Sequence, residues 1–214
     1  MMHADQPSDP AMWNQRFGSP HFAYGREPNV WLKSIIEKMS PHSHPHALFP
    51  ADGEGRNAVW AATRGWMATV FDLSSEGKKK CQILAQEHAV HVSYDVDDLV
   101  KRDFPTQFFG LIACSWFHTP PAIRKKHMPR MLHALTSGGS FVMEGYHKEQ
   151  LQFSSGGPKD VDLLFDLDEV IAELTGELAP PMEIAYAKVE DTVLDESDLH
   201  RGPARVVRIH LRRR

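Results

Sequence analysis

The feature that most constrains the fold of this chain is a regular alternation of strand-like and helix-like segments between residues 47 and 174. Five short apolar runs have the length and composition of buried strands. They cover residues 47–49, 68–71, 90–94, 110–115 and 139–144. Helical patterns follow four of these runs, at 57–64, 75–88, 121–135 and 162–174. Because parallel strands need long crossover connections, this alternation predicts an α/β fold in which helices cover both faces of a parallel sheet.

The two ends of the chain depart from this alternation. Two strand-like runs, 182–194 and 205–211, have no helix between them, which predicts an antiparallel hairpin at one edge of the sheet. Near the start, Pro28 is followed by the pattern of a short amphipathic helix. The prolines at 41 and 45 mark its end. The 214 residues have the size of one domain. We therefore expect a single domain, 1–214, made of a helical cap segment at 1–45 and a core at 46–214.

Composition excludes several classes of protein. No apolar run approaches the ~20 residues that span a bilayer, and the segment from Met1 to Asp9 lacks the basic-then-apolar order of a signal peptide. Cys81 and Cys114 are too few for a disulfide framework and too far apart for a CxxC site. We therefore expect a cytoplasmic protein with no membrane partner.

The charge of the chain is distributed unevenly. Residues 160–198 hold 13 acidic residues and one base, Lys188, whereas the whole chain has a net charge of −4. The same window contains apolar residues such as Phe165 and Ile171, which indicates a folded segment with a solvated acidic face. This distribution argues against a nucleic-acid partner and favours a small substrate.

The residues expected to bind a ligand follow the first three strands, because ligands of parallel sheets bind at the carboxyl ends of the strands. The first strand leads into Ala51-Asp52-Gly53-Glu54-Gly55-Arg56-Asn57, where two glycines allow a sharp turn and a close backbone approach. The second ends at Asp72, whose carboxylate can accept hydrogen bonds from both hydroxyls of a ribose. The third ends at Asp95, which can accept a hydrogen bond from an adenine amino group. An adenosine ligand suits all three positions.

A nicotinamide dinucleotide is an alternative ligand. The segment from Gly53 to Ala58 also satisfies the GxGxxG/A pattern of dinucleotide-binding loops. However, no Tyr-x-x-x-Lys pair follows the fourth or fifth predicted strand. An NAD(P)-dependent oxidoreductase is therefore the weaker interpretation.

The loop and the second strand end resemble a known family. Ala-Asp-Gly-Glu-Gly-Arg-Asn at 51–57 and Phe-Asp-Leu-Ser at 71–74 are similar to motifs of the class I S-adenosylmethionine (SAM)-dependent methyltransferases, and within them to the tellurite-resistance and thiopurine methyltransferase-like branch. The resemblance covers nearly the whole chain and includes residues 13–17, 24–29, 156–158 and 200–204. It implies a Rossmann-like fold with a seven-stranded, mostly parallel sheet and an antiparallel edge hairpin. It also implies methyl transfer from SAM to a small-molecule acceptor, such as a thiol or another soft nucleophile, by a monomer or homodimer.

The resemblance also implies which residues bind the cofactor. These are Tyr24, Ala51, Asp52, Gly53, Gly55, Arg56, Asn57, Asp72, Leu73, Ser74, Asp95, Val96, Asp97, Cys114 and Ser115. Among them, Asp72 holds the ribose, Asp95 and Val96 hold the adenine, and Cys114 and Ser115 lie near the sulfonium. Tryptophan and tyrosine residues near the mouth add cation–π attraction to the sulfonium. The N-terminal segment and the late loops roof the acceptor pocket.

Methyl transfer requires neither a protein nucleophile nor a metal, because the cofactor supplies the electrophile. His118, just after the fourth strand, is a candidate acid or base. His200 and Arg201, before the last strand, are candidates for proton transfer and for holding an anionic acceptor. The alternating histidines between 42 and 46 lie among prolines, which indicates a linker rather than a metal site.

Two positions depart from the family pattern. Phe49 replaces the acid that precedes the first glycine, and Ala51 replaces that glycine itself. These departures leave open a second class of function. The chain could be a non-catalytic protein that binds SAM or S-adenosylhomocysteine (SAH) for sensing or for partner binding.

Overall fold

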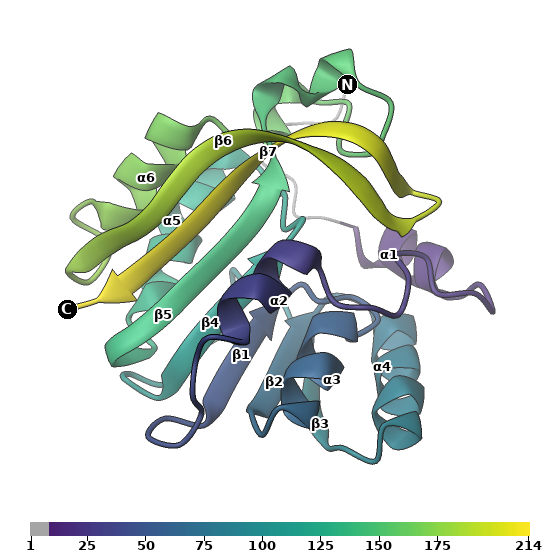
Figure 1. Ribbon diagram of the computed structural model, residues 1–214, viewed down its shortest axis with the longest axis horizontal. Helices are drawn as coiled ribbons and strands as arrows, with labels where there is room; N and C mark the ends of the chain where they lie inside the picture. Colours follow the sequence, from purple (N-terminus) through teal and green to yellow (C-terminus); the bar gives the residue numbers. More distant parts are fainter. Residues whose placement is uncertain (1–8) are drawn as a thin grey trace.

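A seven-stranded sheet with the strand order β3-β2-β1-β4-β5-β7-β6 forms the centre of the protein (Figure 1). The structure is a computed structural model that describes residues 9–214, so residues 1–8 of the predicted cap segment lie outside the described part. The parallel strands are β1 (His46–Pro50), β2 (Met67–Asp72), β3 (Val92–Val96), β4 (Phe109–Ser115) and β5 (Leu135–Tyr146). The long hairpin of β6 (Met182–Ser197) and β7 (His200–Arg213) adds to β5 in antiparallel orientation. The predicted fold class is confirmed.

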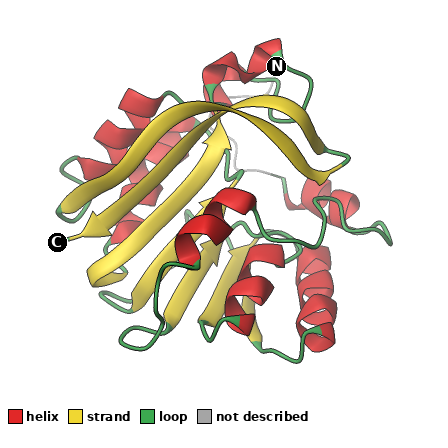
Figure 2. Ribbon diagram, in the orientation of Figure 1, coloured by secondary structure: helices red, strands yellow, loops and turns green. Residues whose placement is uncertain are grey.

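Helices cover both faces of the sheet (Figure 2). One face carries α2 (Val30–Ile36), α3 (Arg56–Thr63) and α4 (Ser75–Glu87), and their buried residues share an apolar cluster with Phe49 and Val70. The other face carries α5 (Pro121–Leu132) and α6 (Leu167–Thr175), which pack against Ile112 and Phe141. Outside these layers, α1 (Pro10–Phe17) packs against α4, and the 3-10 helices η1 (Lys148–Gln152) and η2 (Val161–Leu163) follow β5.

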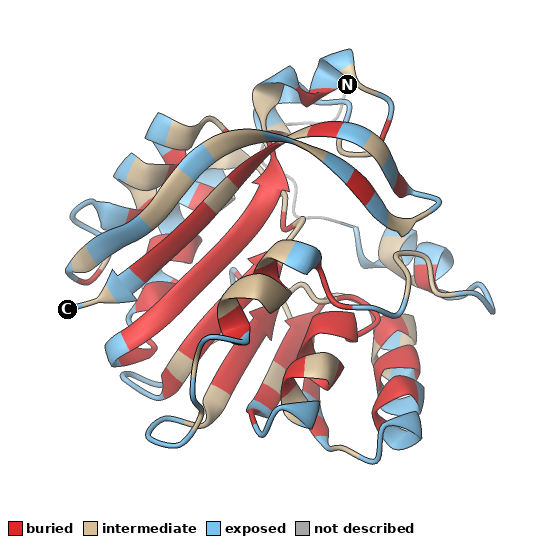
Figure 3. Cartoon of the chain, in the orientation of Figure 1, coloured by how far each residue is buried: buried red, intermediate tan, exposed pale blue. Residues whose placement is uncertain are grey.

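The central strands form short apolar runs in the sequence because both of their faces are buried. The central strands β1, β4 and β5 are buried along most of their length, whereas the edge strand β6 is largely exposed or half-buried (Figure 3). Strands covered on both faces have no solvated side, so they show continuous apolar runs rather than alternation. Because β1 to β4 pair in parallel, their carboxyl ends meet at one edge of the sheet.

The third strand begins two residues later than the sequence pattern predicts. Helix α4 closes with a turn in which Val90 N donates to Ala85 O, so Val90 is not available to the sheet. β3 instead pairs with β2 from Val92 to Val96. As a consequence Asp95 and Val96 lie within the strand, and Asp97 is the first residue after it.

The predicted helix at 162–174 is interrupted. The backbone of Phe165 is bonded to the end of β5, because Phe165 N donates to Tyr146 O at 2.9 Å. Asp166 then caps α6 by accepting from the backbone N–H groups of Asp168 and Glu169. The predicted helix at 121–135 likewise ends early, at Leu132, because Leu135 already pairs with Phe109 of β4.

Candidate functional site

The glycine loop, residues 51–55, joins β1 to α3 in backbone conformations that favour glycine. Ala51, Gly53 and Gly55 have φ angles of 51°, 55° and 83°. A Cβ atom on Gly55 would lie 2.2 Å from Cys81 Sγ, and one on Gly53 would lie 2.8 Å from Phe17 Cζ. Neither glycine can carry a side chain without a shift of its neighbours, whereas Ala51 adopts the left-handed conformation with a Cβ in place.

Asp72, at the carboxyl end of β2, connects this strand to the glycine loop. Its Oδ2 accepts a hydrogen bond from Gly53 N at 3.0 Å, and its Oδ1 accepts one from Ser74 N at 2.9 Å. Desolvation by burial raises the pKa of Asp72 to about 6, although these backbone donors act in the opposite direction. Each carboxylate oxygen retains a second lone pair, so the group can accept further hydrogen bonds from a ligand.

Asp52 and Asn57 brace the same loop from its other side. Asp52 accepts from Ala58 N at 2.9 Å and from Asn57 Nδ2 at 2.6 Å. Burial raises the pKa of Asp52 to about 6. Asn57 Nδ2 also donates to Ser115 Oγ at 3.2 Å, which links the loop to the end of β4. These three predicted cofactor residues therefore hold the loop in shape.

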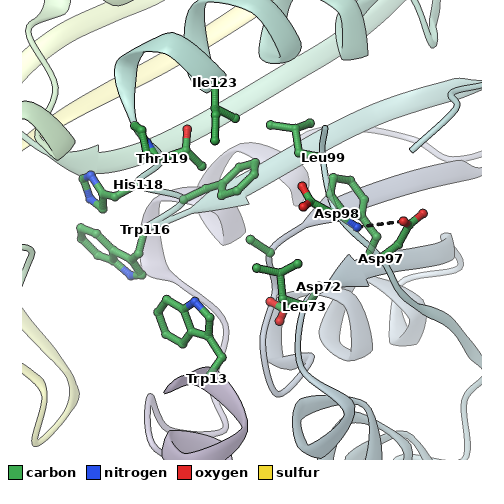
Figure 4. Close-up of a pocket in the computed structure, with 14 residues that line it drawn as sticks. Trp13, Asp72, Leu73, Asp97, Asp98, Leu99, Trp116, His118, Thr119 and Ile123 are labelled. Carbon is green, nitrogen blue, oxygen red and sulfur yellow. Dashed lines mark hydrogen bonds between the residues drawn. The ribbon is translucent and has the colours of Figure 1, made fainter. Parts of the chain in front are cut away.

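A pocket opens at the carboxyl ends of β1 to β4 (Figure 4). It is lined by Trp13, Ala51, Phe71, Asp72, Leu73, Asp97, Asp98, Leu99, Trp116, Phe117, His118, Thr119, Pro120 and Ile123. The predicted site residues among them are Ala51, Asp72, Leu73, Asp97 and His118. The lining combines aromatic rings with three carboxylates, and of the described residues no lysine or arginine contributes to it.

Some predicted cofactor residues lie beside this pocket rather than in its lining. Asp95 is exposed on β3 and pairs with Arg102 at 2.8 Å. Cys114 is buried within β4, where desolvation raises the pKa of its thiol. Ser74 caps α4 by accepting from Gly77 N at 3.0 Å. Val96 is exposed at the end of β3.

Arg56 and Tyr24 belong to a contact between the glycine loop and the N-terminal segment. Arg56 Nη1 donates to the carbonyl oxygens of Tyr24 at 2.9 Å and Glu27 at 3.3 Å. Its Nη2 donates to Glu196 at 2.6 Å. Glu54 supports the same segment by accepting from Ala23 N at 2.8 Å. Arg56 and Glu54 therefore attach the N-terminal segment to the loop.

His118 lines the pocket, but both of its ring nitrogens are bonded to backbone. Nδ1 donates to Leu163 O at 2.8 Å, and Nε2 accepts from Tyr146 N at 3.1 Å. Desolvation lowers the pKa of His118 to about 4. The imidazole is therefore neutral near pH 7, and neither nitrogen is free to exchange a proton with a substrate.

His200 and Arg201 are neighbours in sequence but lie in different environments. The His200 ring is buried against the rings of Tyr24 and Trp116, with centroid distances of 4.7 and 4.8 Å. Its Nδ1 lies 3.5 Å from Glu196 Oε2, beyond a good hydrogen bond, and burial lowers the pKa of His200. Arg201 is 60% exposed and pairs with acidic residues of the hairpin tip. The structure therefore brings His200, but not Arg201, next to a pocket residue.

Glu196 is a residue of this region that the sequence pattern does not reveal. It accepts hydrogen bonds from Arg56 Nη2 at 2.6 Å, Asn29 Nδ2 at 2.7 Å and Trp116 Nε1 at 3.0 Å. Burial alone raises the pKa of this carboxyl, but interactions with His200 and Arg56 outweigh it and bring the pKa to about 2. Glu196 lies in an acidic window, so nothing local distinguishes it from the solvated acids around it.

The described residues contain no group of three His, Cys, Asp or Glu side chains placed to hold a metal ion. No helix in the described part of the chain is long and apolar enough to cross a membrane.

Comparison with known proteins relates this architecture to methyltransferases. No protein-family model and no curated protein sequence matches the chain. A protein that converts a disulfide bond into a thioacetal group during echinomycin biosynthesis superposes with a TM-score of 0.73 at 12% identity, over 95% of this chain and 89% of that one. A SAM-dependent methyltransferase from Methanosarcina mazei superposes with a TM-score of 0.63 at 15% identity, over 84% of this chain and 96% of that one. TehB from Haemophilus influenzae superposes with a TM-score of 0.63 at 12% identity, over 96% of this chain and 67% of that one. At such identities the likeness establishes the fold alone, which this chain shares with SAM-dependent methyltransferases of known structure.

Proposed function

We propose that this protein is a SAM-dependent methyltransferase that acts on a small-molecule acceptor. The observation that carries the proposal is the pocket at the ends of β1 to β4, which brings together Ala51 of the glycine loop, Asp72 and Asp97. Three successive strand ends thus supply a closely approachable backbone and two carboxylates. This is the set of groups that an adenosine ligand with a charged tail requires.

The residues present suit SAM. Ala51 of the glycine loop lines the pocket, and Gly53 and Gly55 hold the turn in positive-φ conformations packed against Phe17 and Cys81. Asp72 has unused lone pairs for the ribose hydroxyls. Asp97 already accepts from Arg102 Nη1 at 2.9 Å, but its oxygens keep further lone pairs that can accept from the adenine amino group. When bound, SAM supplies an electrophilic methyl group on its sulfonium. The protein then has to bind, orient and dehydrate the two reactants, and positioning of this kind can contribute roughly 7–11 kcal/mol to a two-reactant step.

The acceptor that fits best is a thiol or another soft nucleophile. Trp13, Trp116 and Phe117 give the pocket an apolar aromatic wall, and His118 is neutral. Arg201, the predicted partner of an anionic acceptor, lies away from the pocket in ion pairs of its own. Two relatedness arguments agree with sulfur chemistry. The sequence resembles the tellurite-resistance and thiopurine methyltransferase-like branch, and one structure of similar fold concerns the conversion of a disulfide bond into a thioacetal group.

Calorimetric titration with SAM, SAH and NAD tests the cofactor. We expect both sulfur ligands to bind and NAD not to bind; binding of NAD alone would contradict the proposal. Asp72→Ala should weaken SAM binding by about 1–3 kcal/mol through lost hydrogen bonds to a charged group. Asp191→Ala, an exposed acid of β6, is the matched control and should leave SAM affinity unchanged.

A non-catalytic SAM- or SAH-binding protein is the second candidate. The observation in its favour is the pair of departures at Phe49, which is fully buried in an apolar cluster, and Ala51, which has a φ of 51°. A panel of thiols, phenols, amines and oxyanions, assayed for SAH release, distinguishes the two functions. Ligand binding without SAH release from any acceptor would favour the non-catalytic function.

A further inference from the structure

We propose that Trp116, held in place by Glu196, is the side chain that recognises the positive charge of the SAM sulfonium, so that the protein binds SAM in preference to SAH. This inference rests on the proposed SAM binding and assigns a specific role within that site. It is carried by the backbone and side-chain geometry of Trp116 and by the charge of the pocket that this residue lines.

The backbone of Trp116 adopts a conformation that bulky residues avoid. Trp116 directly follows β4 and has a φ of 60°. A large side chain in the left-handed region is a strained arrangement, and such arrangements persist where the surrounding structure imposes them and gather at functional sites. In this conformation Trp116 lines the pocket together with Asp72 and Leu73.

Tyr146, Glu196 and His200 hold the indole in place, and the His200 ring lies in edge contact at a centroid distance of 4.8 Å. The indole ring stacks on Tyr146 at a centroid distance of 4.4 Å and an interplanar angle of 29°. Its Nε1 donates to Glu196 Oε2 at 3.0 Å. Because Tyr146 covers one face, the remaining surface of the ring is what Trp116 presents to the pocket, where Figure 4 shows it bordering the same hollow as Trp13.

A β-bulge directs Glu196 toward this tryptophan. Asp195 pairs with Arg201 and Ser197 pairs with His200, so Glu196 between them has no partner across the hairpin. Bulges of this kind redirect a side chain out of the regular alternation of a strand. The Glu196 carboxylate is thereby buried, with 5% of its side chain exposed, and it accepts from Arg56 as well as from Trp116.

The charge of the pocket favours a cation. Asp72, Asp97 and Asp98 line it. Asp97 pairs with Arg102 at 2.9 Å, but no lysine or arginine in the described part of the chain belongs to the lining itself. The electron-rich face of an indole attracts cations by its quadrupole, more strongly than the other aromatic rings do. Donation of the indole N–H to a carboxylate further increases the electron density of the ring. SAM carries a sulfonium charge that SAH lacks, so this wall should discriminate between them.

The test is the ratio of the SAH and SAM dissociation constants, measured by calorimetry for the full chain and its variants. In Trp116→Leu we expect the preference for SAM over SAH to fall by about 2- to 30-fold, with a smaller fall in Trp116→Phe. Sinefungin, which carries an ammonium in place of the sulfonium, should lose affinity in parallel with SAM. Trp31→Leu is the matched control, because Trp31 packs against Tyr186 away from the pocket. It should keep the wild-type ratio.

Glu196→Gln should also lower the ratio, and Glu190→Gln in the same hairpin should not. If Glu196→Gln fails to fold, the Trp116 variants alone test the inference, because they keep the Arg56–Glu196 ion pair. A purely structural role of Trp116 would weaken SAM and SAH equally, and an unchanged ratio in Trp116→Leu would overturn the inference while leaving the proposed function intact. Failure of the wild-type protein to bind either ligand would overturn both.

Discussion

Arg56 and Glu196 form a buried ion pair that joins the first residue of α3 to the end of β6. The Nη2–Oε2 distance is 2.6 Å, and the two side chains are 6% and 5% exposed. The same arginine binds carbonyl oxygens of the N-terminal segment, and the same glutamate accepts from Trp116. The glycine loop, the N-terminal segment and the hairpin therefore meet at one charged contact inside the protein.

Loss of this pair should destabilise the fold strongly. Arg56→Met leaves the Glu196 carboxylate buried without its cationic partner, and we expect the free energy of unfolding to fall by about 3–5 kcal/mol. Urea unfolding followed by circular dichroism measures the change. Arg201→Met is the control, because its ion pairs lie at the exposed hairpin tip and should contribute only about 0–1 kcal/mol. Equal losses in the two variants would contradict the prediction.

Asp72 should make a pH-dependent contribution to stability. Its pKa is raised from 3.8 to about 6 in the folded protein, so between these pH values the folded state binds the proton more tightly than the unfolded chain does. The stability that this group contributes is present below pH 4 and is lost as the pH rises through about 6. Asp72→Asn has no such loss, so its stability relative to the wild type should increase by up to about 3 kcal/mol between pH 4 and pH 7.

Urea unfolding of the wild type and Asp72→Asn at pH 4.5 and pH 7 measures that difference. Buried histidines whose pKa values are lowered, such as His118 and His200, also make stability depend on pH, and comparison of the two proteins at each pH removes their contribution. Asp191→Asn, an exposed acid on β6, serves as the control and should track the wild type at both pH values. A relative stability of Asp72→Asn that falls with rising pH would show that Asp72 is not a raised-pKa group.

His118 should show the opposite dependence. Its pKa is lowered from 6.5 to about 4, so it contributes stability above pH 6.5 that is lost as the pH falls through about 4. His118→Phe removes the partners of Leu163 O and Tyr146 N and should cost about 1–3 kcal/mol for each buried group at pH 7. The cost should shrink toward pH 4.5, measured by urea unfolding. If the cost of His118→Phe grew on acidification, His118 would be the charged imidazolium in the folded protein.

Much of the fold follows from local sequence because the core strands are covered on both faces. Residues 47–49 and 110–115 read as strands since no side of either strand meets water. The elements that the pattern misplaces are those whose ends depend on tertiary pairing. β3 starts at Val92 rather than Val90 because the pairing with β2 sets its register, and the helix at 162–174 breaks because Phe165 bonds to the end of β5.

The candidate site divides in the same way. The glycine loop and Asp72 are adjacent to strand ends, so their place at the carboxyl edge of the sheet follows from a short stretch of sequence. Glu196 reaches Arg56 across 140 positions, and only the bulge between Asp195 and Ser197 directs it there. The contacts by which Glu196 holds Arg56 and Trp116 depend on such long-range register. A linear pattern carries no signal for it.

Ala51→Gly should relieve strain in the glycine loop. Alanine in the left-handed region destabilises the folded state by about 1–2 kcal/mol. Glycine removes this strain, but its greater freedom in the unfolded chain lowers the free energy of unfolding by about 0.5–1 kcal/mol. We therefore expect Ala51→Gly to raise the free energy of unfolding by about 0–1.5 kcal/mol and to maintain or increase SAM affinity. Ala89→Gly is the matched control, because Ala89 has a φ of 53° but follows α4, away from the pocket. It should gain similar stability without any change in SAM binding. If Ala51→Gly instead loses stability while Ala89→Gly gains it, the packing of the Ala51 methyl against the core outweighs the backbone strain, and the departure from glycine at this position is an adaptation of the loop.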